Sequence, residues 1–249
     1  MTLKINWFKY ASPASFYPLA GKMIPWFAAA SALLFAVGLY WSFFKTPEVL
    51  SEQKQYYKII FIHVPVVWMG MWLYLVMVVW SAIGLVFNTR LSFMMSAAIA
   101  PTGALFTFLG LLTGAIWGKT SWGTWWDWDP RLTSFLILLF LYIGYMALQS
   151  AIDDTRRSDR ASALLLIVGM ALIPVIYWSV NCPDPAQCTA LHQRSGLGKI
   201  EGNILFAMLT MTLAVWMYSF VSILMRLRNI ILERERNKDW VAQLPEVAQ

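Results

Sequence analysis

The two histidines of this 249-residue chain, His63 and His192, are the side chains best suited to bind a metal. A neutral imidazole ligates transition metals through one ring nitrogen, and two imidazoles from different segments can hold a haem iron from both faces. Taken alone, each histidine is more often a hydrogen-bonded structural residue. Zinc is less well supported, because no Cys/His pair has the spacing of zinc ligands. The pair therefore predicts axial ligation of haem.

A tryptophan-rich segment, residues 118–131, is the second candidate feature. It contains four tryptophans: Trp122, Trp125, Trp126 and Trp128. A single tryptophan at a membrane interface usually belongs to the aromatic belt. Four in one short loop are more typical of a platform for a flat apolar ligand, because rigid aromatic rings bury much surface and stack on other conjugated rings. We expect this loop to form part of the haem site.

Asp129 and Arg131 lie at the end of that segment. Asp129 followed by Pro130 is a typical helix start, with aspartate as N-cap and proline at the first helical position. The same carboxylate can also orient an indole N–H. Arg131 has two equally good interpretations, an ion pair with a carboxylate of the ligand or an anchor among lipid phosphates. Both are candidate cofactor-binding residues.

Glycines and cysteines give weaker signals. Gly110, Gly114 and Gly118 recur every four residues, which predicts a helical face open to close approach. Ordinary helix packing is the simpler interpretation, and contact with a flat cofactor edge is the alternative. Cys182 and Cys188 are compatible with a disulfide but lack the spacing of a redox or haem-attachment motif. We assign these two cysteines no chemistry.

The elements that must position these residues are membrane helices. The chain is 59% hydrophobic and 13% charged, with a mean hydropathy of +0.59, outside the range of most soluble domains. About 20 helical residues cross the hydrocarbon core. Six apolar runs are long enough: residues 24–44, 59–87, 93–117, 132–152, 161–180 and 204–227. The sequence predicts an all-α, polytopic membrane protein with six transmembrane helices and one domain, residues 1–249. Pro101 and Pro174 mark kinks or helix starts.

Positive charge predicts the orientation of these helices. An even number of spans puts both termini on one side, and that side carries most of the Lys and Arg residues. By the positive-inside rule both termini are cytoplasmic, and Trp125 and His192 lie outside. Topology and attraction to anionic membrane lipid explain the net charge of +6, so no nucleic-acid partner is needed. The basic stretch 226–238 is expected to be a solvated helical extension, with docking of a cytoplasmic partner as the alternative.

Some functions are disfavoured. The predicted spans contain almost no ionisable residues, unlike those of pumps and proton-coupled transporters. Gly198 and Lys199 do not complete a phosphate-binding loop. Any ATP-driven step must therefore belong to another subunit, and we expect this chain not to be an enzyme.

The segment Trp122-Gly-Thr-Trp-Trp-Asp-Trp-Asp-Pro-Arg-Leu-Thr-Ser134 closely resembles the "WWD" signature of haem-handling proteins in cytochrome c biogenesis. His63-Val-Pro, Leu191-His-Gln and six spans in about 250 residues are similar to the cytochrome c maturation protein C (CcmC) family. The resemblance covers residues 26–228. It implies an outer-face site in which His63 and His192 ligate haem b and the tryptophan loop supports the porphyrin.

The same resemblance implies partners and a location. These are the haem chaperone CcmE, which receives haem, the ABC-transporter subunits CcmA and CcmB, the small membrane protein CcmD, and the bacterial inner membrane, with the haem site on its periplasmic side. Two other functions stay open. One is a membrane b-type cytochrome, disfavoured because both histidines are expected near one face; the other is a permease subunit whose tryptophans are only belt residues.

Overall fold

The computed structural model describes residues 10–47, 54–179 and 200–244, and within these ranges all regular structure is helical. Six segments are long and apolar enough to cross a membrane: Pro13–Phe44, Tyr56–Phe87, Arg90–Trp122, Pro130–Ala151, Thr155–Trp178 and Gly202–Arg234. The prediction of an all-α fold with six membrane-spanning helices is confirmed. The chain is a multi-pass membrane protein.

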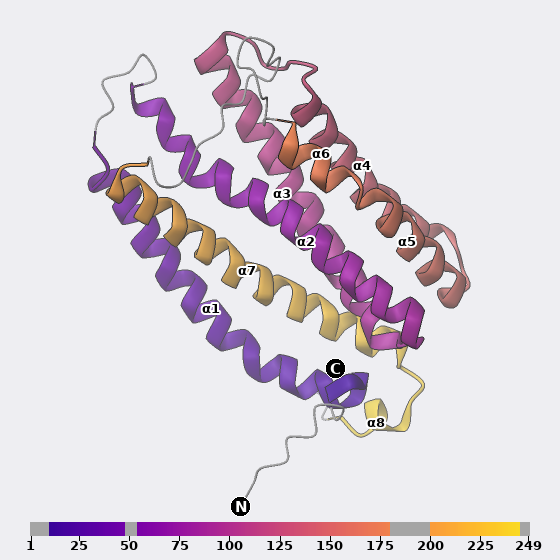
Figure 1. The fold of residues 1–249 in the computed structure, drawn as a ribbon. Coiled ribbons are helices and arrows are strands. Elements are labelled where there is room, and N and C mark those ends of the chain that lie inside the picture. The colour runs from indigo at the N-terminus through magenta and orange to yellow at the C-terminus, as the bar shows by residue number, and fades with distance from the viewer. Residues whose placement is uncertain (1–9, 48–53, 180–199, 245–249) are drawn as a thin grey trace, which may run out of the picture.

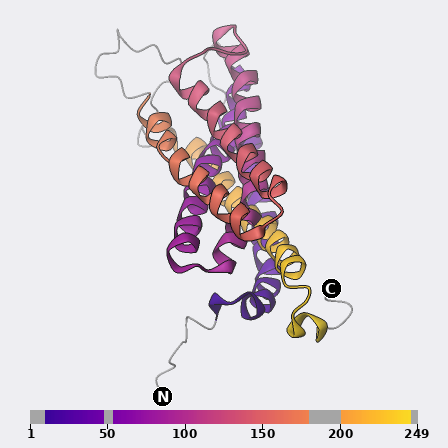
Figure 2. The ribbon, with the colours of Figure 1, turned by 90° about the vertical axis from the view of Figure 1, so that its right-hand side faces the viewer.

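The long helices form an elongated bundle (Figures 1 and 2). At one edge α1 (Pro13–Phe44) packs along α7 (Gly202–Arg234). In the middle lie α2 (Ile60–Phe87), entered through the 3₁₀ helix η2 (Lys54–Ile59), and α3 (Arg90–Trp122). The opposite edge is made of α4 (Pro130–Ala151), α5 (Thr155–Gly169) and α6 (Leu172–Trp178).

Several helices extend beyond the apolar runs that predicted them, and the fifth span begins at Thr155 instead of residue 161. The first begins at Pro13 because the Ser12 hydroxyl accepts a hydrogen bond from the Ser15 N–H at 3.4 Å, and proline suits the first helical position. The third continues to Trp122 and the sixth to Arg234. Hydropathy marks only the part of a helix that suits hydrocarbon, whereas backbone hydrogen bonds continue through polar residues.

The fifth span is interrupted rather than continuous. Its two helices, α5 and α6, are separated at Met170 and Ala171. Pro174 has no N–H to donate to the Met170 carbonyl, which instead accepts from Ile173 at 3.1 Å. Pro174 therefore belongs to a helix start. Pro101, by contrast, lies within the uninterrupted helix α3.

Two buried tyrosines join the middle helices to the α4–α5 edge. The Tyr142 hydroxyl donates to the Gly70 carbonyl at 2.8 Å, and the Tyr74 hydroxyl donates to the Leu166 carbonyl at 3.1 Å. Their rings meet edge to face, with centroids 5.4 Å apart. A Cβ atom on Gly103 would overlap the Tyr142 ring, so only glycine permits this approach. These hydroxyls need hydrogen-bond acceptors within the protein, because lipid hydrocarbon provides no hydrogen-bonding groups.

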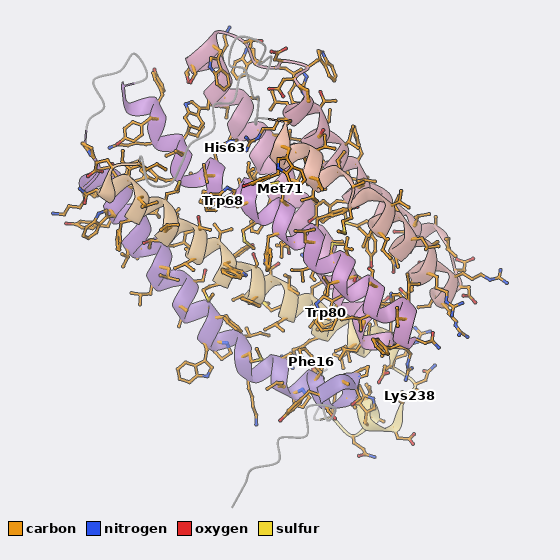
Figure 3. The ribbon with its side chains drawn as sticks, viewed as in Figure 1. Phe16, His63, Trp68, Met71, Trp80 and Lys238 are labelled. Carbon is orange, nitrogen blue, oxygen red and sulfur yellow. The ribbon has the colours of Figure 1, made fainter. Side chains whose placement is uncertain are left out.

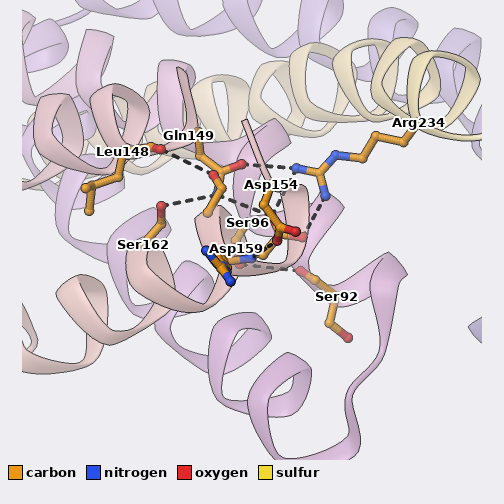
Figure 4. Close-up of polar contacts among 10 residues, drawn as sticks. Ser92, Ser96, Leu148, Gln149, Asp154, Asp159, Ser162 and Arg234 are labelled. Atoms are coloured by element: carbon orange, nitrogen blue, oxygen red, sulfur yellow. Dashed lines mark hydrogen bonds and ion pairs between the residues drawn. The ribbon is translucent and has the colours of Figure 1, made fainter. Parts of the chain in front are cut away.

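At the end of the bundle where α1 begins and α7 ends, here called the terminal end, a polar network ties three helices together (Figure 4). Arg234 on α7 donates to both carboxylate oxygens of Asp159 on α5, at 2.9 and 3.0 Å, and to the Gln149 side-chain oxygen on α4 at 3.0 Å. Gln149 in turn donates to the Ser162 hydroxyl at 3.2 Å.

The basic stretch 226–238 does not behave as the solvated extension that we expected. Arg226 donates to the Ala98 carbonyl at 3.1 Å and the Thr102 hydroxyl at 2.9 Å, and the Arg228 guanidinium lies 4.3 Å from the centre of the Tyr17 ring. Together with Arg234, these side chains pack into the bundle. The expectation is wrong for them because α7 continues against its neighbours instead of leaving the bundle. The short helix α8 (Asp239–Ala242) lies at the same end as the start of α1 (Figure 1).

The opposite end contains the start of α7, the end of α3 at Trp122, and the connection from α3 to α4, which carries Trp125, Trp126 and Trp128. It is here called the tryptophan end. The Glu201 carboxylate accepts hydrogen bonds from the Ile204 N–H at 3.0 Å and the Asn203 side-chain amide at 2.9 Å. The backbone N–H groups of Asn203 and Ile204 lower the pKa of Glu201 below its ordinary value. Asn203 also accepts from the Trp41 indole at 3.2 Å, which fixes α1 beside α7.

Candidate functional site

The structure places the described site residues together at the tryptophan end of the bundle. His63 is the fourth residue of α2, near the upper end of that helix in Figure 3. Trp122 is the last residue of α3, and Arg131 is the second of α4. The loop between them carries Trp125, Trp126 and Trp128. His192 lies outside the described residues, as do Cys182 and Cys188, so their predicted roles stay predictions.

The loop is shorter than the predicted range 118–131. Residues 118–122 are the last turn of α3, and the irregular segment covers only residues 123–129. Gly123 ends the helix in a left-handed conformation with φ 78°, which glycine adopts without steric cost. The Lys119 ammonium donates to the Gly123 carbonyl at 2.9 Å and closes the turn. Gly123 is therefore a helix end, and Gly118 is not a turn residue.

His63 is buried against one face of α3. Its Nδ1 atom lies 3.0 Å from the Thr113 hydroxyl oxygen, and its ring meets the Trp117 ring edge to face, with centroids 5.7 Å apart. A Cβ atom on Gly114 would lie 3.0 Å from Cε1 of His63, which is closer than ordinary contacts allow. Thr113, Gly114 and Trp117 therefore fix the plane and the position of the imidazole ring.

The four predicted tryptophans differ in exposure. Trp122, Trp125 and Trp128 are exposed, whereas Trp126 is half-buried and meets Trp128 edge to face with centroids 5.5 Å apart. Behind the loop is a cavity of about 10 Å³, lined in part by Gly114, Gly118 and the side chains of Trp122, Trp125 and Trp126. This is room for about one water molecule. A flat ligand therefore has to lie against the exposed rings or displace them.

Asp129 has the structural role that its sequence predicts. One carboxylate oxygen accepts a hydrogen bond from the Leu132 N–H at 2.6 Å, and Pro130 occupies the first helical position of α4. The side chain is only 4% exposed. Its second oxygen, Oδ2, is buried without a hydrogen-bond partner. Arg131 is half-buried, and neither ion pair found within the described ranges involves it.

Unpaired polar atoms gather at this end of the bundle. Seven buried side-chain atoms in the described part of the chain have no hydrogen-bond partner, and five of them lie here: Trp117 Nε1, Ser121 Oγ, Trp126 Nε1, Asp129 Oδ2 and Thr133 Oγ1. A buried polar group without a partner costs about 1–3 kcal/mol. Four of the five can donate a hydrogen bond. The site therefore suits a ligand that brings acceptor groups, such as carboxylates.

The glycine stripe is explained by helix packing. A Cβ atom on Gly110 would press on Val67 and Phe135, and one on Gly114 would press on His63. Gly118 lies against the Thr124 carbonyl and the Trp122 ring. The simpler of the two sequence interpretations is therefore confirmed for Gly110. At Gly114 the packing partner is itself a candidate ligand, which links the stripe to the site.

Sequence reasoning did not identify Thr113 or Trp117 as site residues. Both lie on the same face of α3 as Ser121, at intervals of four residues. That interval was the only available signal, and it could not show which helix faces them. Within the described residues no group of three or more His, Cys, Asp or Glu side chains converges as a metal site. Any metal bound through His63 needs a further ligand from elsewhere.

A larger cavity lies away from these residues. Its volume is about 560 Å³, and its walls come from α2, α6, α7 and Met170, including Trp68, Met71, Trp178 and Trp216. Trp68 and Met71 follow His63 along α2 (Figure 3). The lining contains no ionisable carboxylate or cationic side chain. None of the predicted site residues that the structure describes lines it, so volume alone does not locate the site.

Known proteins resemble the chain over nearly its whole length. A family profile described as Heme exporter protein C (CcmC) matches residues 6–242. Heme exporter protein C of Escherichia coli strain K12 is 40% identical over 238 residues, covering 94% of each chain. That of Bradyrhizobium diazoefficiens is 41% identical over 224 residues, covering 90% of this chain and 84% of the relative. That of Haemophilus influenzae is 35% identical over 242 residues, covering 95% and 96%. The chain belongs to the CcmC, or heme exporter protein C, family.

Proposed function

We propose that this chain is a haem-handling subunit of a heme exporter in cytochrome c maturation, which holds haem b through His63 and His192 and transfers it to the chaperone CcmE. The name of its family, heme exporter protein C, supports a role in haem handling. The arrangement of His63 is the observation that supports the site: a buried imidazole that contacts three residues on one face of α3, beside a tryptophan-rich loop.

The surroundings of His63 fit haem as cargo. Haem offers a flat conjugated ring, two carboxylates and an iron atom that imidazole ligates. Exposed Trp122, Trp125 and Trp128 supply aromatic surface for the ring. The unpaired donors on Trp117 and Trp126, together with the Arg131 guanidinium, suit the carboxylates. Asp129 Oδ2, which has no hydrogen-bond partner, is available to orient an indole N–H, the second role that the sequence suggests for this carboxylate.

The partners and the orientation belong to the same proposal. Both termini are cytoplasmic, the tryptophan end faces the periplasm, and the whole chain acts as one domain of the bacterial inner membrane. ATP hydrolysis is supplied by CcmA with CcmB, and CcmD completes the complex. The exposure of the tryptophans supports transfer, because a periplasmic chaperone reaches an exposed aromatic edge more easily than a buried one.

Absorption spectra of the purified protein test the proposal. We expect wild-type protein supplied with haem to show a six-coordinate low-spin spectrum, and His63→Ala or His192→Ala to abolish stable retention, because the chain has no third imidazole. Tyr56→Ala, an exposed aromatic change in η2, is the control for effects of mutation as such. A double histidine variant with an unchanged spectrum would disprove axial ligation by this pair.

Two other results would favour the competing functions. Haem that stays bound when CcmE is added, with no transfer, would favour a b-type cytochrome. Complete absence of haem from gently purified wild-type protein, even after haem is supplied, would favour a permease subunit with belt tryptophans only.

A further inference from the structure

The hydrogen bonding of Thr113 determines which nitrogen of His63 carries the proton. The Thr113 oxygen lies 2.6 Å from the Leu109 carbonyl oxygen and 3.3 Å from that of Gly110. Carbonyl oxygens only accept hydrogen bonds, so the single hydroxyl proton of Thr113 points back along α3. Toward Nδ1 of His63, which lies 3.0 Å away, the hydroxyl oxygen therefore presents a lone pair and can only accept a hydrogen bond.

Because the Thr113 oxygen is an acceptor, Nδ1 of His63 must carry the proton of this hydrogen bond. If Nδ1 were instead the acceptor, Thr113 would have to give up its shorter bond to Leu109. The neutral His63 ring therefore carries its hydrogen on Nδ1 and its lone pair on Nε2. Nε2 is the nitrogen with which an imidazole of this tautomer ligates a metal.

The ring has no alternative orientation that preserves this bond. Gly114 brings the backbone of α3 against Cε1, and Trp117 contacts the ring from one helical turn further along. Rotation of the imidazole would move Cε1 into α3 or break the Thr113 bond. Thr113, Gly114 and Trp117 thus hold one tautomer in one orientation before any ligand arrives.

We propose that Thr113 is a positioning residue for haem, which fixes His63 as the Nδ1–H tautomer and strengthens Nε2 as an iron ligand. The effect on iron rests on the proposed haem function, whereas the tautomer does not. A chain of hydrogen bonds from Nδ1–H through the Thr113 hydroxyl to the Leu109 carbonyl polarises the ring and raises the basicity of Nε2. Removing a partner of this kind lowers metal affinity about 10- to 100-fold in other metal sites.

Nitrogen NMR of haem-free protein tests the tautomer by itself. In a His192→Ala background His63 is the only histidine, so ¹⁵N-histidine labelling gives one imidazole to observe. We expect Nδ1 to be protonated and Nε2 to be unprotonated. Thr113→Val keeps the branched shape without the hydroxyl, and it should lose this preference; Thr113→Ser should keep it. Thr113→Ala is a second hydroxyl-free variant if valine does not fold.

A matched control is available on α7. The Thr212 hydroxyl also donates to the carbonyl four residues earlier, that of Met208, at 2.8 Å, whereas the partner of His63 Nδ1 is Thr113. Thr212→Val should leave the His63 tautomer unchanged. An Nε2–H tautomer in protein that retains Thr113, or the same tautomer in Thr113→Val as in its parent, would overturn the inference.

Haem affinity of the chain with both histidines tests the consequence. We expect Thr113→Val to weaken haem binding about 10- to 100-fold and to alter the low-spin spectrum, while Thr113→Ser and Thr212→Val bind as wild type does. Unchanged affinity and spectrum in Thr113→Val would overturn the positioning role. Unchanged affinity in His63→Ala would instead overturn the proposed haem site, and the NMR result would still decide the tautomer.

Discussion

The guanidinium of Arg234 meets both carboxylate oxygens of Asp159, at 2.9 and 3.0 Å, in a pair whose side chains are 19% and 7% exposed. Arg234 ends α7 and Asp159 is in the first turns of α5, so the pair fastens two spans that are far apart in sequence. Its position at the terminal end separates it from the candidate haem site.

Loss of the Asp159 carboxylate should destabilise the protein more than it affects haem. Asp159→Ala leaves Arg234 partly buried without its counter-ion, and removing one partner of a buried pair costs about 3 kcal/mol. Thermal unfolding in detergent measures the effect. Asp153→Ala, at an exposed position in the connection before α5, is the control and should change stability by less than about 0.5 kcal/mol. Equal stability of the two variants would contradict a structural role for the pair.

Gly103→Val should reduce the yield of folded protein. The new side chain would overlap the Tyr142 ring, which cannot retreat without breaking its 2.8 Å bond to the Gly70 carbonyl. Overpacking of this kind costs about 1–3 kcal/mol. Yield and thermal stability after membrane extraction are the measurements. A Cβ atom on Gly202 meets nothing within 4 Å, so Gly202→Ala should be tolerated; a tolerated Gly103→Val would show that α3 and α4 move apart easily.

Substitutions at Asp129 should separate helix capping from haem binding. Asparagine still accepts from the Leu132 N–H, so Asp129→Asn should be nearly as stable as wild type, whereas Asp129→Ala should lose about 1 kcal/mol. Only the carboxylate charge at Oδ2 is lost in the asparagine variant. If that oxygen serves the site, Asp129→Asn should retain less haem at unchanged stability. Full haem retention in Asp129→Asn would leave capping as its role.

Labelling of introduced cysteines should reveal the orientation. In a background without Cys182 and Cys188, an impermeant thiol reagent added to intact cells should label Thr120→Cys, which is exposed at the tryptophan end. It should not label Asp153→Cys at the terminal end until the membrane is opened. The reverse pattern would place the tryptophans in the cytoplasm and contradict the proposed transfer to a periplasmic partner.

The exposed tryptophans should matter more for transfer than for retention. Trp125→Ala with Trp126→Ala removes aromatic contacts worth about 0.5–1.5 kcal/mol per pair beyond their area, while His63 keeps its contacts with α3. We expect the double variant to keep part of its haem and to lose delivery to CcmE more severely. Haem on this chain and haem on CcmE are measured in the same membranes. Delivery that falls only in proportion to retained haem would limit the tryptophans to binding.

Local pattern in the sequence was sufficient for the number of spans and for the start of α4, but not for the ends of the helices or the break in the fifth span. Hydropathy depends on neighbouring residues only, and the aspartate-proline pair places both capping groups within one turn. The tryptophan signature also predicted the family, which the comparisons confirm. The predicted start of the loop at Gly118 was wrong because sequence alone does not distinguish Gly118 from Gly123, and only Gly123 adopts the left-handed conformation that ends α3.

Only the tertiary structure decided what surrounds His63 and Arg234. Thr113 is 50 residues from His63, and Arg234 is 75 from Asp159. Their contacts depend on which faces of α2, α3, α5 and α7 pack together, and no local periodicity specifies a partner helix. The sequence therefore determined which residues can do the chemistry, whereas packing between distant helices determined the orientation of the imidazole and the hydrogen bond it makes.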